Sequence, residues 1–474
     1  MRSSPHALAS RSRDDDAKPH GRRTRPVAET LTGPLPHIDQ ETYYDLTAPP
    51  LPLPAAAGSM DCEVCVIGGG LLGAALALEL SSHGVDTILL EAEQIGAGAS
   101  GRCGGFMLPG VAASFDVLAR HVGVDGARSI NAIGIDGAQS IRDWSKAFGF
   151  DCELEQGILW AASRPRHLKY LRESYERRRR HHPELSHDEI GVSESRRRSG
   201  SDAYHGGIVD PETWTVHPLR LVRGLAAAAL SRGARLYARS RVVRVASEEG
   251  VVATHGALVK ARHVVTCANV FNGDIHPATK ATLLPATTFL AATRPLTSPE
   301  RDAVLPRVHA VLDTQPAVDY YRLAADGTLL FGGGVASQVH DPAVAEARMR
   351  ARIEAVFPVL RGIAIVRAWT GWIDLTPGAM PTVRQWAGGR TLAVHGLNGH
   401  GICMTVGLGR AIAADLLQRL GRKSDAGRRT AFAHLVRLPS PRMPGVRWWR
   451  HLAVPAAHWW FSAADRLGIG HGSR

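Results

Sequence analysis

A short apolar run that ends in a cluster of glycines is the first strongly patterned stretch of the chain. Residues 62–67 are mostly apolar and rich in β-branched side chains, which is typical of a parallel strand buried on both faces. Residues 68–84 continue with glycine, alanine and leucine and predict a helix that begins in the glycine turn, while residues 85–90 predict a second strand. The pattern therefore indicates one complete β-α-β unit within about 30 residues.

Strand and helix patterns return further along the chain, separated by sheet-like sequence. We expect helices in residues 113–148, 168–182, 217–231 and 402–420, and strands in residues 235–245, 258–266, 308–312, 320–331 and 391–394. Elements of a dinucleotide-binding fold thus occur at the beginning, in the middle and at the end. This order predicts a mixed α/β protein in which a Rossmann-type domain is interleaved with a second domain built on an antiparallel sheet.

The predicted domain boundaries fall several times within the chain. We assign the cofactor-binding domain to residues 41–125, 192–275 and 362–420, and the second domain to residues 126–191 and 276–361. With 474 residues the chain is long enough to build both cores. The two ends differ in composition, and we expect a disordered extension in residues 1–40 and a basic aromatic tail in residues 421–474.

The net charge of +12 is concentrated at the C-terminal end. From residue 419 onwards there are eleven Lys or Arg and two Asp or Glu, so nine of the twelve net positive charges belong to the tail. The nearly neutral body argues against a nucleic-acid partner. Contact of the tail with an anionic membrane is one interpretation of Trp448, Trp449, Trp459 and Trp460, but packing on the body or on a second subunit is the simpler one.

Six widely spaced cysteines do not form a disulfide framework, so we expect reduced thiols and a cytoplasmic protein. Cys62 and Cys65 point to opposite faces of the predicted strand, and no second pair completes a zinc site, so we expect no metal. Arg22 and Arg23 are not followed by the apolar stretch of an export signal. The longest apolar run, residues 64–78, is too short and too glycine-rich to span a membrane.

Each glycine of the turn meets a separate physical need. Gly68 permits the bend out of the strand, Gly70 lets the backbone approach a pyrophosphate, and Gly73 lets the helix pack closely on the sheet. Backbone amides at the helix N-terminus then face the phosphates. Glu91 lies 18 residues after Gly73, where a carboxylate accepts hydrogen bonds from ribose hydroxyls. An acid at this position disfavours NADPH and leaves FAD and NAD open.

Segments far apart in the chain carry a family resemblance. Glu91-Ala92 is followed by Gly98-Ala99-Ser100-Gly101-Arg102-Cys103-Gly104-Gly105, which resembles the second FAD-contacting segment of the D-amino-acid-oxidase-like flavoenzymes. Three more stretches match that family: residues 204–207 with His217-Pro218, residues 320–322 with the glycines at 332–334, and residues 396–401. The combination covers about residues 41–467 and is most similar to the γ-glutamylputrescine oxidase branch, although Cys103 stands where the family commonly has Asn.

The resemblance implies noncovalent FAD, held by the interleaved Rossmann-type domain. The implied contacts belong to the glycine turn, the ribose acid, the second segment, two later strands and the final glycine motif: Gly68, Gly70, Leu71, Leu72, Gly73, Glu91, Ala92, Ala99, Ser100, Gly101, Arg102, Val243, Ala268, Gly399, His400 and Gly401. In the final motif, glycines before a helix bring N–H groups and a positive dipole end towards the flavin's pyrimidine end. Some members of the superfamily attach flavin covalently, but Cys403 is not in a matching context.

Aromatic and arginine residues of the second domain are the candidates for the substrate side. We expect Tyr320, Tyr321, Arg322 and Trp369 to line it, with Trp372 nearby. Arg322 is suited to bidentate pairing with a substrate carboxylate. The competing interpretation of Arg322 is a surface ion pair. The competing interpretation of the two tryptophans is packing in the core. The resemblance implies oxidation of the C–N bond of a small amine or amino acid, with hydride transfer to flavin N5 and hydrolysis of the resulting imine.

Other functions stay open. One is a D-amino-acid, glycine or sarcosine-type oxidase, or a quinone-linked dehydrogenase, because the sequence does not distinguish oxygen from another electron acceptor. The other, from a different class, is a non-catalytic flavin-bound interaction or membrane-surface protein. The sequence does not predict the oligomeric state.

Overall fold

Five parallel strands form the centre of a sheet that carries the glycine turn at its carboxyl edge. The order of the main path is β16-β17-β10-β1-β2-β7, and β9 and β8 continue from β10. Strands β17, β10, β1, β2 and β7 are mutually parallel, which confirms the Rossmann-type part of the predicted fold. The strands are β1 Gly58–Ile67, β2 Thr87–Leu90, β7 Arg235–Tyr237, β8 Val242–Ala246, β9 Val251–Thr254, β10 Ala257–Thr266, β16 Thr382–Trp386 and β17 Thr391–His395.

The structure is a computed structural model that describes residues 40–181, 186–315, 318–337 and 339–442, all within one contact unit, Pro36–Arg474. The predicted disordered extension, apart from its last residue, lies outside the described residues. The tail beyond residue 442, with its four tryptophans, also lies outside them.

A second sheet carries the candidate substrate side. In the described residues its order is β15-β11-β14-β13-β12-β4-β6-β3, with β5 paired to β6. All neighbours are antiparallel except β12 and β4, which are parallel. The strands are β3 Phe106–Met107, β4 Glu155–Ala161, β5 Asp188–Ile190, β6 Gly207–Thr215, β11 Leu284–Pro295, β12 Ala310–Asp313, β13 Asp319–Leu323, β14 Thr328–Ala336 and β15 Ile365–Leu375.

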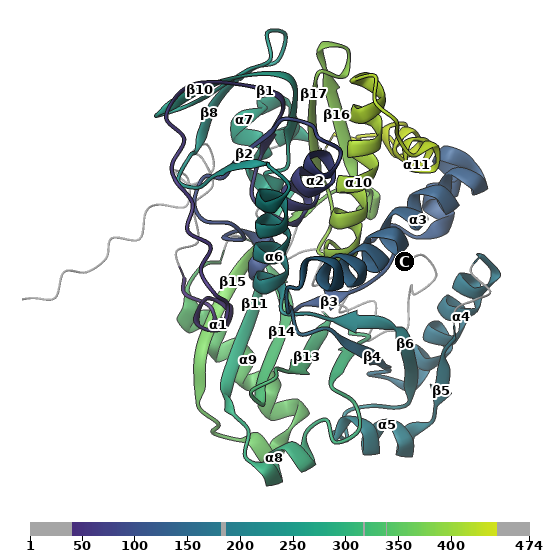
Figure 1. Cartoon of the computed structure of the whole chain (residues 1–474). Helices are drawn as coiled ribbons and strands as arrows, with labels where there is room; N and C mark the ends of the chain where they lie inside the picture. The colour runs from purple at the N-terminus through teal and green to yellow at the C-terminus, as the bar shows by residue number, and fades with distance from the viewer. Residues whose placement is uncertain (1–39, 182–185, 316–317, 338, 443–474) are drawn as a thin grey trace, which may run out of the picture. The chain divides into compact units, whose positions relative to one another are not determined.

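Helices pack on both sheets. Helix α2 lies between α6 and α10, α10 also contacts α3 and α11, and α9 covers β11, β14 and β15 of the second sheet (Figure 1). The helices are α1 Tyr43–Thr47, α2 Leu71–Ser82, α3 Phe115–Phe148, α4 Pro165–His181, α5 Val192–Ser199, α6 Pro218–Ser231, α7 Asn272–Ile275, α8 Ser298–Ala303, α9 Pro342–Val356, α10 Ile402–Arg419 and α11 Ala426–Val436.

Glycine brings α3 and α10 into backbone contact. A Cβ atom on Gly407 of α10 would lie 1.8 Å from the carbonyl oxygen of Ile133, and one on Gly137 of α3 would lie 1.9 Å from that of Cys403. Neither position accepts a side chain without separating the helices. The crossing therefore fixes where α10 begins relative to the rest of the molecule.

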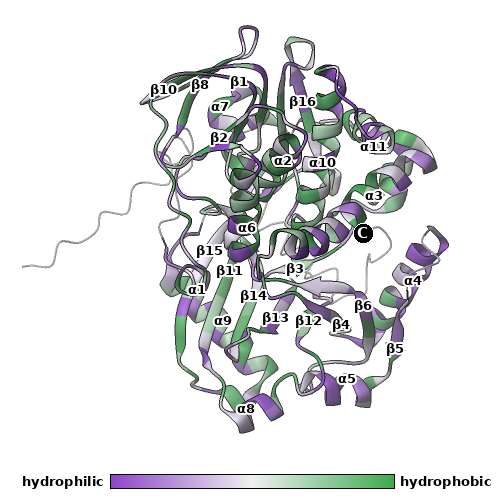
Figure 2. Ribbon diagram, viewed as in Figure 1, coloured by the Kyte–Doolittle hydropathy of each residue, from purple (hydrophilic) through white to green (hydrophobic). Residues whose placement is uncertain are grey.

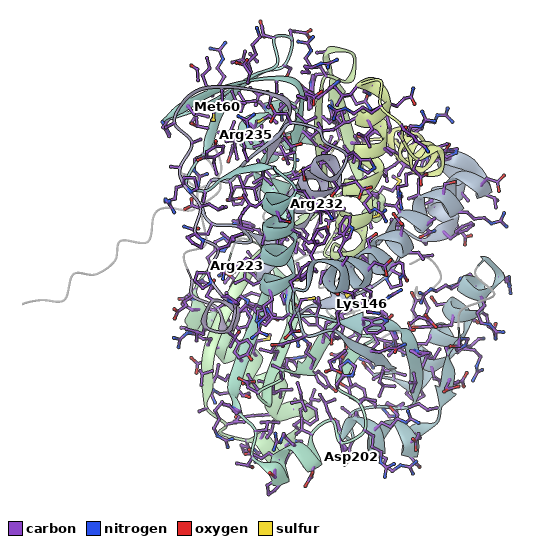
Figure 3. The ribbon with its side chains drawn as sticks, viewed as in Figure 1. Met60, Lys146, Asp202, Arg223, Arg232 and Arg235 are labelled. Atoms are coloured by element: carbon purple, nitrogen blue, oxygen red, sulfur yellow. The ribbon has the colours of Figure 1, made fainter. Side chains whose placement is uncertain are left out.

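Polar contacts fasten surface segments to this frame. Arg223 of α6, labelled in Figure 3, donates to the carbonyl oxygens of Ala48 at 3.1 Å and Pro49 at 2.9 Å, and so holds the segment that leads into β1.

Helix α4 is coloured largely hydrophilic in Figure 2, and Arg177, Arg179 and Arg180 are exposed on it. Charged side chains exposed in a row of this kind are typical of a solvated helix face.

The sequence pattern predicts the Rossmann-type elements well and the second sheet poorly. It does not predict β4, β6, β11, β15 or α9. In β11, Leu290 packs in the core that includes α2 and α10, while Phe289 packs in the core beneath α9. Because both faces are buried, the alternation that marks a strand is absent.

Hydrogen-bond pairing also bears on the proposed domain division. Strands β3, β6 and β15 belong to the second sheet, although they fall within the residues 41–125, 192–275 and 362–420 assigned to the cofactor domain. The division into discontinuous domains stays a prediction, and by their hydrogen-bond pairing these three strands go with the second sheet. Among the described residues, no helix has the length and apolar character needed to cross a bilayer.

Candidate functional site

The glycine turn has the geometry that the sequence predicts. Gly68 follows β1 with φ +108, and a Cβ atom there would lie 2.7 Å from the carbonyl oxygen of Cys267, which follows β10. A Cβ atom on Gly73 would lie 2.0 Å from the carbonyl oxygen of Gly68. The first turn of α2 therefore presses directly on the bend, as a pyrophosphate-binding turn requires.

Two side chains hold this turn in shape. Glu91 accepts hydrogen bonds from the amide of Gly69 at Oε2, 2.6 Å, and from the amide of Glu93 at Oε1, 2.8 Å. Burial raises the pKa of the Glu91 carboxyl. Ser100 brings in the second segment, because its Oγ accepts from the amide of Leu71 at 2.9 Å.

The helix start retains the donors that an anionic cofactor needs. Within the part of the chain that the structure describes, the amides of Gly70, Leu72 and Gly73 donate to no protein acceptor. Their position at the N-terminus of a 12-residue helix provides N–H groups and a positive dipole end. The residues present therefore fit a dinucleotide pyrophosphate.

The second segment links the two sheets. Ala99, Ser100 and Gly101 form a short 3-10 helix directly beside the turn. The next residue, Arg102, donates from Nε to the carbonyl oxygen of Thr370 at 3.1 Å, and its own carbonyl oxygen accepts from Nε1 of Trp369 at 2.9 Å. The Arg102 backbone and side chain thus tie the cofactor segment to β15 of the second sheet.

The third segment, residues 396–401, lies at the carboxyl end of β17 and leads into α10. Asn398 and Gly399 adopt left-handed backbone angles, φ +54 and φ +75. Burial lowers the pKa of the following residue, His400, to about 4, so its imidazole is neutral at pH 7. In the described structure, the amides of Gly399 and Gly401 donate to no protein acceptor and stay available at the start of the helix.

Other predicted contacts lie near these segments or at the edge of the sheet. Ala92 directly follows Glu91, whose contact with a ribose stays a prediction. The amide of Ala268 donates to Oδ1 of Asn272 at 2.9 Å, at the carboxyl end of β10. Val243 lies on β8 with 48% of its surface exposed. No further contact of Val243 supports its predicted role, which stays a prediction.

The substrate-side candidates divide between the two faces of the second sheet. Tyr320 and Arg322 alternate with Tyr321 along β13, as neighbouring residues of a strand do. Tyr320 packs in the same core cluster as Trp369. Tyr321 faces α9, where it stacks on Phe331 at 5.0 Å and its hydroxyl lies 2.7 Å from that of Tyr204.

The same alternation separates the tryptophans of β15. Trp369 lies on the face of Tyr320, and Gly371 is close to the Cβ atom of Arg102. Trp372 has the opposite parity and packs against His340 at 4.3 Å. The structure therefore brings together Tyr320, Arg322 and Trp369, and places Tyr321 and Trp372 on the other face.

Tyr320 and Arg322 are held tightly by the second segment. A Cβ atom on Gly104 would lie 2.5 Å from the Tyr320 ring, and one on Gly332 would lie 2.3 Å from it, so two glycines form the slot for this ring. Arg322 is buried and donates from Nε to the carbonyl oxygen of Gly104 and from Nη2 to that of Val216, both at 3.1 Å. Side-on bidentate pairing with a carboxylate would require displacement of both carbonyls.

Sequence reasoning missed a tyrosine supplied by the N-terminal helix. Tyr44 of α1 is fully buried and packs edge-on against Trp369 at 5.6 Å and His217 at 4.9 Å. Burial raises the pKa of its hydroxyl to about 12. The signal for α1 is present in the sequence, because Thr42 and Asp45 form a capping box.

Sequence reasoning also missed the role of Asp374, at the end of β15. Its carboxylate is buried against the segment that follows β17, and burial raises its pKa to about 6. Oδ2 accepts from the amide of Gly396 and Oδ1 from that of Leu397 at 3.2 Å. No short motif marks such a residue, because its partners lie more than 20 positions away.

Comparisons with known proteins agree with this site. The family model described as FAD dependent oxidoreductase, DAO, matches residues 63–415. Gamma-glutamylputrescine oxidoreductase of Escherichia coli K12 is 34% identical over 418 residues, which cover 87% of this chain and 94% of that protein. The probable oxidoreductase OrdL of Haemophilus influenzae is 30% identical over 384 residues, which cover 79% of this chain and 87% of that protein.

A solved structure confirms the fold. The glycine oxidase from Geobacillus kaustophilus matches with a TM-score of 0.65 at 20% identity, over 77% of this chain and 96% of that one. The family match spans the glycine turn, the second segment and the segment before α10. The family resemblance drawn from the sequence is confirmed, and the chain belongs to the FAD-dependent oxidoreductases of the D-amino-acid-oxidase-like family.

Proposed function

We propose that this enzyme uses noncovalent FAD to oxidise the C–N bond of a small amine or amino acid, with γ-glutamylputrescine-like molecules as the substrate class. Bound FAD supplies the acceptor for a hydride equivalent taken from the carbon next to nitrogen. The resulting imine then hydrolyses to a carbonyl compound and an amine. The relative at 34% identity, which is named for γ-glutamylputrescine and is matched along 94% of its length, carries this proposal.

The arrangement of the second sheet supports an apolar substrate side with one fixed cation. The Tyr320 ring is half-buried and provides apolar surface that excludes water from the reacting carbon, whereas Trp369 is fully buried and supports this side from the core. Arg322 is buried and forms no salt bridge among the described residues, although burial raises the pKa of the nearby Glu153 carboxyl and the Arg322 charge opposes that rise. A buried cation of this kind favours an anionic group nearby. Because its Nε and Nη2 are engaged by carbonyls, we propose that the remaining Nη1 meets a substrate carboxylate end-on.

The cysteines near the site support a noncovalent cofactor. Cys403 is fully buried on α10, and burial raises the pKa of its thiol. Burial also raises the pKa of the Cys103 thiol in the second segment. A thiol with a raised pKa stays protonated and is a poor nucleophile, so neither residue is suited to attack the flavin ring.

A test uses the purified full-length protein under anaerobic conditions. The flavin absorbance should bleach with γ-glutamylated diamines and stay unchanged with matched amines that lack the carboxylate. Acid precipitation should release all of the flavin into solution. Reoxidation of the bleached enzyme by oxygen or by a quinone then identifies the electron acceptor. The proposal would be refuted if none of the γ-glutamylated diamines, simple amines and amino acids that are tested bleaches the flavin.

A further inference from the structure

One buried carboxylate holds the whole segment that precedes α10. The Asp374 carboxylate receives the amides of Gly396 and Leu397, and its main-chain oxygen accepts from the amide of Asn398 at 3.1 Å. Three consecutive amides of the segment are therefore bound by a single residue of β15. Asp374 has 2% of its surface exposed, so water does not compete for these hydrogen bonds.

The Asn398 side chain adds a second set of ties to the same strand end. Its Oδ1 accepts from the amide of Thr376 at 2.8 Å, and its Nδ2 donates to the Thr376 hydroxyl at 3.1 Å and to the carbonyl oxygen of Gly396 at 2.5 Å. Asn tolerates the left-handed backbone that this arrangement needs better than most residues do. The segment is thus fixed in direction before it reaches Gly399.

The consequence appears in the next three residues. Because the amides of residues 396–398 are directed at Asp374, the first unengaged amides are those of Gly399 and Gly401 at the start of α10. These groups form the predicted contact with the pyrimidine end of the flavin. Negative charge develops there when the flavin is reduced, and N–H groups aimed at it stabilise the reduced form more than the oxidised form.

We propose that Asp374 is a positioning residue that, together with Asn398, aims the residues 399–401 at the flavin. This inference rests on the proposed FAD site. It assigns to Asp374 an effect on both the affinity for FAD and the reduction potential of the bound flavin. The residue acts through the segment and does not touch the cofactor itself.

Asp374→Asn is the direct test, because each carboxylate oxygen serves one amide. Asparagine offers one oxygen and must present its NH2 group to the other amide, so one buried N–H loses its acceptor. Asp313→Asn is the matched control. Asp313 is equally buried, but its Oδ1 alone accepts from the backbone amides of Gln315 at 3.0 Å and Asp319 at 2.9 Å, so asparagine can serve both. Its Oδ2 accepts from Nε2 of the Gln315 side chain at 2.6 Å, and that side-chain amide can turn to accept from the NH2 group of asparagine.

Asn398→Gly separates the effect of displacing residues 399–401 from the effect of removing the negative charge of Asp374. Glycine keeps the left-handed backbone of this residue and removes only its side-chain hydrogen bonds, without any change in charge. If Asp374→Asn does not fold, Asn398→Gly still decides the matter.

The measurements are the dissociation constant of FAD and the midpoint potential of the bound flavin in the full-length protein. We expect Asp374→Asn and Asn398→Gly to weaken FAD binding about tenfold, and to lower the potential by about 30 mV for each tenfold loss of preference for reduced flavin. Asp313→Asn should change neither quantity. A higher potential in Asp374→Asn would show that the charge of Asp374, and not its placement of the segment, governs the flavin, and it would overturn the proposal. Unchanged values in Asn398→Gly would also overturn it. Wild-type protein without affinity for FAD would instead refute the proposed FAD site.

Discussion

Gly73→Ala tests the contact between α2 and the glycine turn. The new Cβ atom would lie 2.0 Å from the carbonyl oxygen of Gly68, and ordinary contact begins at 3.4 Å, so the helix start must retreat by about 1.4 Å. The oxygen belongs to the main chain and the Cβ atom is bonded directly to the main chain, so no flexible side chain can relieve the clash. Overpacking of this kind costs about 1–3 kcal/mol. Because FAD needs the closed turn, the same cost should weaken FAD binding by about 5- to 150-fold.

The assay is a titration of the FAD-free protein followed by flavin fluorescence, together with thermal unfolding of the FAD-free and FAD-bound forms. Gly191→Ala provides the control, because Gly191 has φ −76 and no atom within 4 Å of its added Cβ. That variant should bind FAD as the wild type does. A Gly73→Ala protein that binds FAD with wild-type affinity would show that the close contact between α2 and the turn is not needed for the cofactor.

Two further predictions concern buried carboxylates. Glu91→Gln leaves the amide of either Gly69 or Glu93 without an acceptor, at a cost of about 1–3 kcal/mol. We therefore expect this variant to bind FAD more weakly in the same titration. An unchanged affinity would contradict the role of Glu91 in holding the turn. For Asp313, burial and the nearby Asp319 charge raise the pKa above its usual value. The folded state thus holds this proton more tightly than the unfolded state, and the contribution of Asp313 to stability falls as the pH rises from about 4, where the unfolded side chain titrates, towards neutral. The stability of Asp313→Asn relative to the wild type should increase over this range in parallel denaturant titrations, and a constant difference would contradict the prediction.

The cofactor turn could be predicted from the sequence because its determinants are local. Gly68, Gly70 and Gly73 lie within six positions, and the strand and helix around them have unmistakable patterns. Glu91 lies one β-α-β unit away, at a spacing that the unit itself sets. The structure adds the reason for each spacing, since Glu91 and Ser100 both accept amides of this turn.

The substrate side was harder to predict because the alternation of side chains along a strand decides which candidates lie on it. The sequence groups Tyr320, Tyr321 and Arg322 as one stretch, but a strand sends consecutive side chains to opposite faces. Assigning the faces requires the register of β13 with β14, in which Tyr321 lies opposite Phe331. That register depends on β14 and β11, and β11 has no alternating pattern because both of its faces are buried.

The two halves of the site depend on each other through Arg102. Its side chain and its main-chain oxygen both bind β15, at Thr370 and Trp369, while Ser100 just before it binds the helix start at Leu71. A shift of the second segment therefore moves both β15, on the predicted substrate side, and the glycine turn at the start of α2. The hydrogen bonds of residues 100–102 therefore couple the position of β15 to the position of the glycine turn. This coupling explains how residues far apart in the sequence form a single site.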